Sequence, residues 1–343
     1  MGAFIGPANK GRDSIVFMKT KDEYSIAIIV CYIGILPNGF KLWEKSCCFN
    51  PGYDFILITD QDLTTSCKNI HIIKRTLEQI SRYIASKIDI QIEIDRPYKL
   101  CDFRPMFGVI FSDWLEKYDF WGHCDLDQIF GNLDSFITLD ILHNNKKIYQ
   151  LGHLTLYKND DEMNHLFEKE GGMDWRTAVL DKHSCFFDEV VIRDKCRLNN
   201  ISVYTKRDYA DINPWHMRFR LSDDLISIAE KRMNNKKNQI FYWENGKIFR
   251  AYINSYCELK KEEFCYIHFQ KRTLAPPTFN VETVNSFYIT NQGFIERNSL
   301  LADDKAIEYY NKYPGFFKEF CEELRYWVCE YKKRLLLRIQ KHM

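Results

Sequence analysis

Residues 118–133 read Tyr-Asp-Phe-Trp-Gly-His-Cys-Asp-Leu-Asp-Gln-Ile-Phe-Gly-Asn-Leu. The apolar run at 120–124 ends abruptly at Asp125 and Asp127, the pattern of a buried strand that delivers carboxylates at its carboxyl end. Residues two apart in an extended chain project to the same side, so both carboxylates can converge on one point. Two anionic oxygen ligands suit a hard divalent cation such as Mn²⁺ or Mg²⁺, and such an ion most often holds a diphosphate.

The Asp-x-Asp pattern also occurs as Asp60-Gln-Asp62, after the apolar run at 55–58. Either copy could instead be the solvated acidic turn with which strands of α/β proteins commonly end. The copy at 125–127 is favoured because the strand before it is hydrophobic on both faces. Gly131, which follows it, permits a tight backbone turn.

Composition limits the classes of protein to which this chain can belong. Its 343 residues can bury a sizeable core, as one large domain or as one domain with an appendage. The net charge of +1 argues against a nucleic-acid binder. The 12 cysteines include no Cys-x-x-Cys pair, which favours reduced core thiols in a cytoplasmic protein. No segment approaches the ~20 apolar residues that span a bilayer, and no signal-peptide core is present.

Alternation of strands and helices predicts an α/β fold, with a Rossmann-type sheet flanked by helices. We expect strands at 25–32, 53–59, 70–74 and 147–157, helices at 40–49 and 77–87, and a hairpin at 244–247. Ligands of such sheets bind beyond the carboxyl ends of the strands, where Tyr32, Asp60 and Asp125 would lie. Glycine-rich nucleotide motifs and a Gly-x-Ser-x-Gly elbow are absent from the sequence, so metal and side chains must hold any phosphate.

The segment 97–108 offers two interpretations. Lys99, Asp102 and Arg104 are interleaved with large apolar residues just before the acidic strand. In the first interpretation the segment is a helix N-terminus capped by Asp102, with solvated basic neighbours. In the second, Lys99 or Arg104 binds phosphate and Asp102 binds a ribose or a base edge.

Asp188 and Glu189 follow two phenylalanines. An apolar wall beside a carboxylate raises its pKa toward the value that a general base needs. The alternative is that one of the two acids caps the following helix. In the expected strand 147–157, Gly152 would mark close approach by a ligand, and His153 could face an acceptor hydroxyl or be structural.

His268 lies in an aromatic strand and is followed by Lys271 and Arg272. Histidine as a third metal ligand, with cations behind it for phosphate, would complete the site that Asp125 and Asp127 begin. A buried histidine whose hydrogen bonds are satisfied by backbone is the alternative.

Three segments are expected along the chain: a weakly ordered leader at 1–23, the main domain at 24–300 and a helical tail at 301–343. In the tail, aromatic residues recur at helical spacing and basic residues crowd the end. Aromatic residues along one face of a helix indicate core packing or a partner contact. The basic end makes a helix on the inner face of the plasma membrane the second possibility.

Several of these segments together resemble a family of bacterial glycosyltransferases of the GT-A fold that are encoded with capsule and lipopolysaccharide genes. The segments that carry the resemblance are 32–38, 55–60, 97–105, 118–127, 152–157, 187–189 and 267–272. The resemblance implies a GT-A-like fold and the transfer of a hexose from a UDP-sugar to a saccharide or lipid-linked saccharide acceptor. An inverting mechanism is expected, with retention as the open alternative, and galactose or galactofuranose is the first donor sugar to test.

Roles for individual residues also follow from the resemblance. The loop that carries Tyr32 and Gly34, together with Asp60, Lys99 and Asp102, would hold the nucleotide. Asp125, Asp127 and His268 would hold Mn²⁺ or Mg²⁺ on the diphosphate, and Lys271 would add positive charge at the leaving group. Asp188 or Glu189 would remove the acceptor proton.

Two other functions remain open. A sugar-phosphate nucleotidyltransferase would release pyrophosphate instead of UDP. A non-catalytic assembly factor of a polysaccharide complex, held by the aromatic tail, would release neither.

Overall fold

The structure is a computed structural model that describes residues 24–214, 218–222, 235–236, 238–270, 272–298, 303–311, 315, 317, 320–321, 324–325 and 328. The expected leader at 1–23, Lys271 and most of the expected tail helix lie outside the described residues. Within the described part of the chain, no helix is long and apolar enough to cross a membrane.

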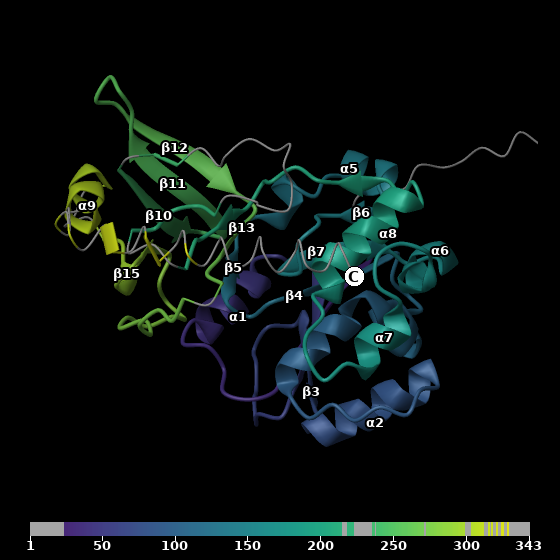
Figure 1. Ribbon diagram of the computed structural model, residues 1–343. Coiled ribbons are helices and arrows are strands. Elements are labelled where there is room, and N and C mark those ends of the chain that lie inside the picture. Colours follow the sequence, from purple (N-terminus) through teal and green to yellow (C-terminus); the bar gives the residue numbers. More distant parts are fainter. Residues whose placement is uncertain are drawn as a thin grey trace, which may run out of the picture.

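In this part of the chain, seven strands form the largest sheet, in the order β3-β2-β1-β4-β7-β6-β8 (Figure 1). The strands are β1 (Ile26–Cys31), β2 (Tyr53–Thr59), β3 (Ile70–Lys74), β4 (Phe120–Cys124), β6 (Lys147–Ile148), β7 (Leu154–Lys158) and β8 (Val203–Tyr204). The first four strands in the order run parallel, and β7 pairs antiparallel with β4. The sheet is therefore mixed.

Helices cover both faces of this sheet, which confirms the predicted fold class. Side chains alternate along β1: Ile26 and Ile28 join one hydrophobic cluster, whereas Ala27 and Ile29 join the other. The helices and short helical turns are α1 (Phe40–Cys48), α2 (Leu77–Ile88), η2 (Pro97–Met106), α3 (Phe107–Ile110), α4 (Ser112–Leu115), η3 (Leu133–Ser135), α5 (Leu139–Asn144), α6 (Asp161–Asn164), η4 (Leu166–Glu168), α7 (Trp175–Leu180), η5 (Phe187–Val191) and α8 (Ile192–Leu198). Of these helices, α1 packs in the cluster that contains Ile26 and Ile28. Helices α2 and α7 pack in the cluster that contains Ala27 and Ile29.

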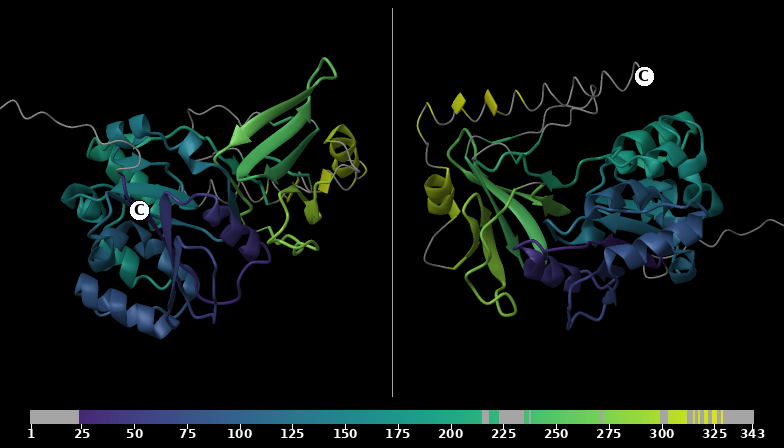
Figure 2. Two further views of the ribbon diagram at one scale, coloured as in Figure 1. Left: turned by 180° about the vertical axis from the view of Figure 1, so that it is seen from behind. Right: turned by 60° about the horizontal axis from the view of Figure 1, so that its bottom comes forward.

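A second, antiparallel sheet lies to one side of the first (Figures 1 and 2). Its order is β12-β11-β10-β14-β15, and α9 (Asp303–Tyr310) packs on it. The strands are β10 (Gln239–Glu244), β11 (Lys247–Ile253), β12 (Leu259–Phe264), β14 (Ser286–Thr290) and β15 (Gly293–Glu296). The hairpin at 244–247 is the part of this sheet that the sequence predicted. Asn245 and Gly246 have positive φ, as a tight β-turn requires.

A small sheet in the order β5-β13-β9 joins these two parts. Its strands are β5 (Gln128–Phe130), β13 (Tyr266–His268) and β9 (Ala210–Asp211). β5 follows the acidic turn after β4, and β13 follows the last residue of β12 after one position. The small sheet therefore brings segments that are far apart in the sequence to one place.

Two expectations differ from the structure. The segment 147–157 is not one interrupted strand: it forms the antiparallel pair β6 and β7, because the chain reverses between Ile148 and Leu154. Cys48 and Cys67 form a disulfide, whereas reduced thiols were expected throughout.

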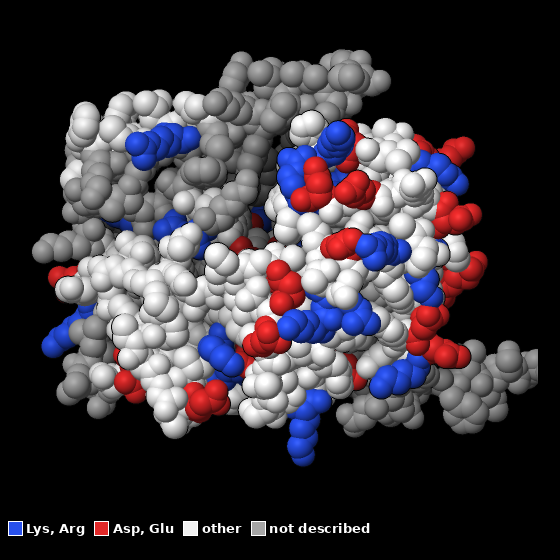
Figure 3. Space-filling model, turned by 90° about the horizontal axis from the view of Figure 1, so that it is seen from below, with Lys and Arg blue, Asp and Glu red and all other residues white. Residues whose placement is uncertain are grey.

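On the face drawn in Figure 3, positively and negatively charged side chains lie next to one another, in keeping with the balanced composition.

Candidate active site

The structure brings together the three residues predicted to ligate a metal. One ligand atom from each of Asp125, Asp127 and His268 lies within 4.8 Å of the other two. His268 Nε2 is 3.4 Å from Asp127 Oδ1 and 3.6 Å from Asp125 Oδ2. The two acids lie in the turn between β4 and β5, and β13 pairs with β5 so that His268 is opposite Gln128. This pairing places the histidine beside the acidic turn.

A residue that the sequence analysis missed, Asp211, orients this histidine. Asp211 Oδ1 accepts a hydrogen bond from Nδ1 of His268 at 2.8 Å, because β9 and β13 run parallel and place the two residues opposite each other. Gln270 Nε2 donates to the other oxygen of Asp211 at 2.8 Å. An imidazole held through Nδ1 by a carboxylate directs Nε2 at a metal, as is common in metal sites.

These groups fit a divalent cation. Two carboxylates and a carboxylate-oriented imidazole provide oxygen and nitrogen donors that suit first-row divalent ions. Burial lowers the pKa of His268, but the Asp127 and Asp211 carboxylates outweigh it and raise this pKa well above its usual value. In this protonated state Nε2 carries a proton, which a cation bound at Nε2 would displace.

Arg104 links the candidate metal ligands to the candidate catalytic acids. Its Nη2 donates to Asp125 Oδ1, and its Nη1 donates to Asp188 Oδ2 at 3.0 Å and to Gly152 O at 3.2 Å. The Arg104 side chain is 13% exposed and the Asp188 side chain 7%, so the bridge is shielded from water. Asp125 and Asp188 therefore lie on either side of one guanidinium group.

Asp188 and Glu189 belong to η5, and neither caps a helix, because no side-chain hydrogen bond caps η5 or the following α8. Burial raises the pKa of Asp188 to about 7, although Arg104 opposes the shift. Burial also raises the pKa of Glu189, whose Oε1 accepts a hydrogen bond from Gly152 N at 3.2 Å. The direction of both shifts is the one expected for carboxylates beside an apolar wall.

Gly152 allows a close approach by protein side chains, and the approach of a ligand to its backbone stays a prediction. A Cβ atom on Gly152 would lie 2.6 Å from Asp188 Oδ2 and 3.3 Å from Arg104 Nη1. The neighbouring His153 is buried, its Nδ1 is 2.8 Å from the Tyr266 hydroxyl, and its ring stacks on that of His268 at 4.5 Å. Burial lowers the pKa of His153 to about 3, so this imidazole is neutral at physiological pH.

The loop after β1 lies at the same edge of the sheet. Gly34 N donates to Asp60 Oδ1 at 3.0 Å, which joins the ends of β1 and β2. Burial, followed by the charges of Asp127 and Asp125, raises the pKa of Tyr32. In the second Asp-x-Asp copy, Asp62 is 88% exposed and pairs with Lys74, so it lies outside the metal-ligand group.

Lys99 and Asp102, predicted to contact the nucleotide, contact each other and the protein backbone. Lys99 Nζ donates to Asp102 Oδ2 at 2.9 Å and to the backbone oxygens of Ala178 and His183. The buried Asp102 carboxylate accepts hydrogen bonds from Cys185 N and Phe187 N and is no helix cap. The pair thus holds the segment that precedes Asp188.

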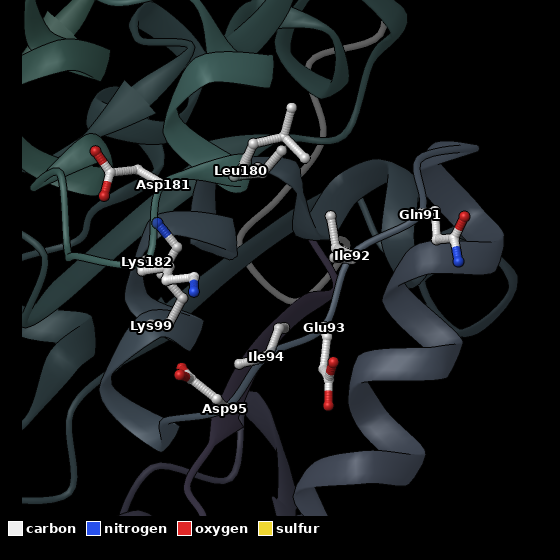
Figure 4. A pocket seen from close by; sticks show the side chains of 10 residues that line it. Gln91, Ile92, Glu93, Ile94, Asp95, Lys99, Leu180, Asp181 and Lys182 are labelled. Atoms are coloured by element: carbon white, nitrogen blue, oxygen red, sulfur yellow. The ribbon is translucent and has the colours of Figure 1, made fainter.

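Lys99 also borders a cavity of about 450 Å³. Figure 4 shows residues Gln91 to Asp95 on one side of it and Leu180, Asp181 and Lys182 on the other. The lining contains none of the metal-ligand group and neither catalytic candidate. Arg272, the other cation predicted to lie behind His268, donates from Nη2 to Asn213 O at 2.9 Å.

Comparisons with known proteins give one family and several solved structures. The model of a family of unknown function, DUF6625, matches residues 28–298. No sequence among curated proteins matches the chain. The glycosyltransferase GlyE from Streptococcus pneumoniae TIGR4 aligns over 54% of this chain and 46% of its own, with 14% identity and a TM-score of 0.30. The galactosyltransferase LgtC, in complex with donor and acceptor sugar analogues, aligns over 54% of this chain and 75% of its own, with 9% identity and a TM-score of 0.27. The chain thus spans less than half of the length of GlyE.

Proposed function

We propose a function for this chain, which belongs to the family of unknown function DUF6625: it is a metal-dependent glycosyltransferase that moves a hexose from a UDP-sugar to a saccharide or lipid-linked saccharide acceptor. Galactose and galactofuranose are the first donor sugars to test, and cell-surface polysaccharide synthesis is the proposed setting. The observation that carries the proposal is the grouping of Asp125, Asp127 and His268, joined through Arg104 to Asp188.

Asp125, Asp127 and His268 would hold Mn²⁺ or Mg²⁺. A cation bound there would supply positive charge against the diphosphate of the departing UDP. Asp211 fixes the orientation of His268, and Arg104 fixes that of Asp125. The loop of Tyr32 and Gly34, with Asp60, lies at the same edge of the sheet and is proposed to contact the nucleotide.

Asp188 is our first choice for the proton acceptor in an inverting transfer. It takes the proton of the attacking acceptor hydroxyl, the oxygen of that hydroxyl forms the new bond to the anomeric carbon, and the bond from that carbon to the diphosphate oxygen breaks with its electron pair. UDP is the leaving group. A carboxylate whose pKa is about 7 is matched to this task near neutral pH.

The proposal extends to the placement of the protein. Residues 24–300 would form the transferase domain, and the basic tail at 301–343 would contact the inner face of the plasma membrane from the cytoplasm. Lys271 would add positive charge near the leaving group.

The test is a titration of UDP binding with Mn²⁺ and Mg²⁺, followed by product analysis with UDP-galactose. We expect UDP to bind more tightly with the cation in the wild type and in Asp62→Ala, the matched change in the other Asp-x-Asp copy, but not in Asp127→Ala. Binding that ignores the cation in all three proteins would remove the metal from the proposal. Release of pyrophosphate in place of UDP would indicate a nucleotidyltransferase.

A further inference from the structure

His123 is a buried histidine on β4 that takes no part in the chemistry proposed above. Its Nδ1 lies 3.1 Å from Gly152 O, and because a carbonyl oxygen only accepts hydrogen bonds, Nδ1 carries the proton and donates it. Its Nε2 is buried and has no hydrogen-bond partner among the described residues. Such an atom costs free energy that an apolar side chain of similar size would avoid, so the contact with Gly152 is what a histidine adds at this position.

The backbone of Gly152 is held at both of its polar groups. Its carbonyl oxygen accepts hydrogen bonds from His123 Nδ1 and from Arg104 Nη1, at 3.1 Å and 3.2 Å. Its amide donates to Glu189 Oε1 at 3.2 Å. The same Nη1 of Arg104 donates to Asp188 Oδ2 at 3.0 Å. Gly152 is therefore connected to both candidate catalytic acids, to one directly and to the other through the guanidinium group.

Strand β4 gives this contact a firm support. It pairs with β1 on one side and with β7 on the other, and all of its residues are buried. The His123 ring packs edge-on against that of Phe107, with the centroids 6.4 Å apart, which restricts its rotation. The turn that carries Gly152 is tied to the end of the strand a second time, because Asp125 N donates to His153 O at 3.1 Å. Of these two ties, the imidazole is the one that reaches the Gly152 carbonyl.

We propose that His123 is a positioning residue for the two candidate catalytic acids and acts on them through the backbone of Gly152. The inference rests on the proposed function and adds a residue to its site. The Nδ1–H group fixes the carbonyl oxygen, so that Arg104 Nη1 is shared between this oxygen and Asp188 Oδ2. The same contact keeps the Gly152 amide against Glu189.

Loss of the imidazole donor changes the balance between the partners of Arg104. The buried Gly152 carbonyl is left with one donor in place of two, so it draws Nη1 toward itself and the bond to Asp188 lengthens. The Arg104 charge lowers the pKa of Asp188, whereas burial and the charges of Glu189 and Asp125 raise it. A longer bond therefore raises this pKa. The other titratable groups that the Asp188 charge affects are the same in every variant below: Tyr98, Cys101, Lys147 and Tyr157.

The test compares His123→Leu with His123→Asn. The two new side chains have the same branching, but the asparagine keeps an N–H donor at the place of Nδ1. We expect His123→Leu to lower kcat for UDP release about tenfold and to move the fall of kcat/KM to a pH about one unit higher. The donor KM should stay near the wild-type value, because the loop after β1 is unchanged. His123→Asn should keep the wild-type pH profile.

Thr155→Val is the matched control for a lost contact in the same turn. Thr155 lies opposite His123 in the pairing of β4 and β7, and its Oγ1 donates to Leu151 O at 2.8 Å. This substitution loosens the turn at another carbonyl and should keep the wild-type pH profile. Urea unfolding shows whether each variant is folded. If His123→Leu does not fold, His123→Gln replaces it, with the same shift expected, because its amide lies one bond farther from the backbone than Nδ1.

A folded His123→Leu protein with the wild-type kcat and pH profile would overturn the role, and so would an equal shift in His123→Asn or Thr155→Val. If the wild type releases UDP from no UDP-sugar, the proposed function fails, and an NMR titration of the Asp188 carboxyl carbon tests the positioning by itself. A midpoint that rises in His123→Leu and stays unchanged in the other two variants supports the role. The same midpoint in all four proteins rejects it.

Discussion

Asp188 gives the site its expected dependence on pH. Burial raises the pKa of this carboxyl to about 7. A general base acts in its deprotonated form, so kcat/KM for sugar transfer should fall as the pH drops below about 7 and level off above it. The measurement is a pH profile of UDP release for the wild type and Asp188→Asn, which should lose activity at every pH. A profile that is flat between pH 5 and 8 would mean that a group other than Asp188 accepts the proton.

Gly152 is a second residue whose substitution should have a measurable effect on the site. A Cβ there would lie 2.6 Å from Asp188 Oδ2, which is bonded to the buried Arg104, so neither side chain can move away freely. We expect Gly152→Ala to lower kcat about 100-fold and the free energy of unfolding by about 1–3 kcal/mol. Activity assays and urea unfolding test this.

Gly52→Ala is the matched control for that change, because a Cβ on the exposed Gly52 meets nothing within 4 Å. The control should leave both measurements near the wild-type values. Equal effects in the two variants would show that the contact with Asp188 is unimportant.

At the scale of elements, the sequence was sufficient where one local pattern decides the structure. Strands β2, β3 and β4 occupy the residues predicted for them, because each is mostly apolar and ends at or just before a polar residue. The hairpin between β10 and β11 was predicted from Asn245 and Gly246, which a tight turn requires. Two metal-ligand candidates followed from the same local reasoning, since Asp125 and Asp127 end a buried strand.

Elements that depend on distant pairing could not be predicted in this way. β9 is two residues long, and Asp211 acquires its contact with His268 from a parallel neighbour that follows far along the chain. Asp102 was interpreted as a helix cap or as a contact of the nucleotide, because its partners, Cys185 N and Phe187 N, lie far along the chain where no local pattern reveals them. The reversal between β6 and β7 was missed because Tyr149 and Leu151, in the turn between them, continue the apolar alternation of a strand.

Strand β6 carries a buried lysine that makes its stability depend on pH. Lys147 is 1% exposed, its Nζ donates to Tyr149 O at 2.6 Å, and burial lowers its pKa from 10.5 to about 8. Between these two pH values the unfolded chain binds the proton and the folded protein does not, so raising the pH favours folding. Below pH 8 both states bind the proton and the burial penalty is at its largest.

We therefore expect the free energy of unfolding of the wild type, relative to Lys147→Met, to rise by up to about 3 kcal/mol between pH 8 and pH 10.5. Urea unfolding at several pH values measures it. Lys158→Met, a change at a lysine whose side chain is 50% exposed on β7, should show no such trend relative to the wild type. A pH-independent difference for Lys147→Met would mean that the ammonium is solvated in the folded protein.

At the scale of the whole molecule, the candidate metal ligands come from two parts of the fold. Asp125 and Asp127 follow a strand of the large sheet, whereas His268 follows the antiparallel sheet by way of β12 and β13. An ion bound by all three therefore links the two parts. Because it binds the folded protein and not the unfolded chain, it stabilises the fold as a whole.

Mn²⁺ at about 100 times its Kd should raise the Tm by about 2–4 °C. Asp62→Ala should respond in the same way, whereas Asp127→Ala and His268→Ala should not respond. Differential scanning calorimetry with and without EDTA measures the shift. A Tm that is the same with and without Mn²⁺ in the wild type would contradict cation binding at this site.

The separation of these ligands along the sequence has a consequence during translation. The acidic turn leaves the ribosome long before the strand that carries His268, and Asp211 emerges between them. An incomplete nascent chain therefore holds carboxylates without their imidazole. On the function proposed here, sugar transfer begins when synthesis has passed residue 268 and the short strands β5, β13 and β9 have paired, so truncated translation products cannot consume nucleotide sugars.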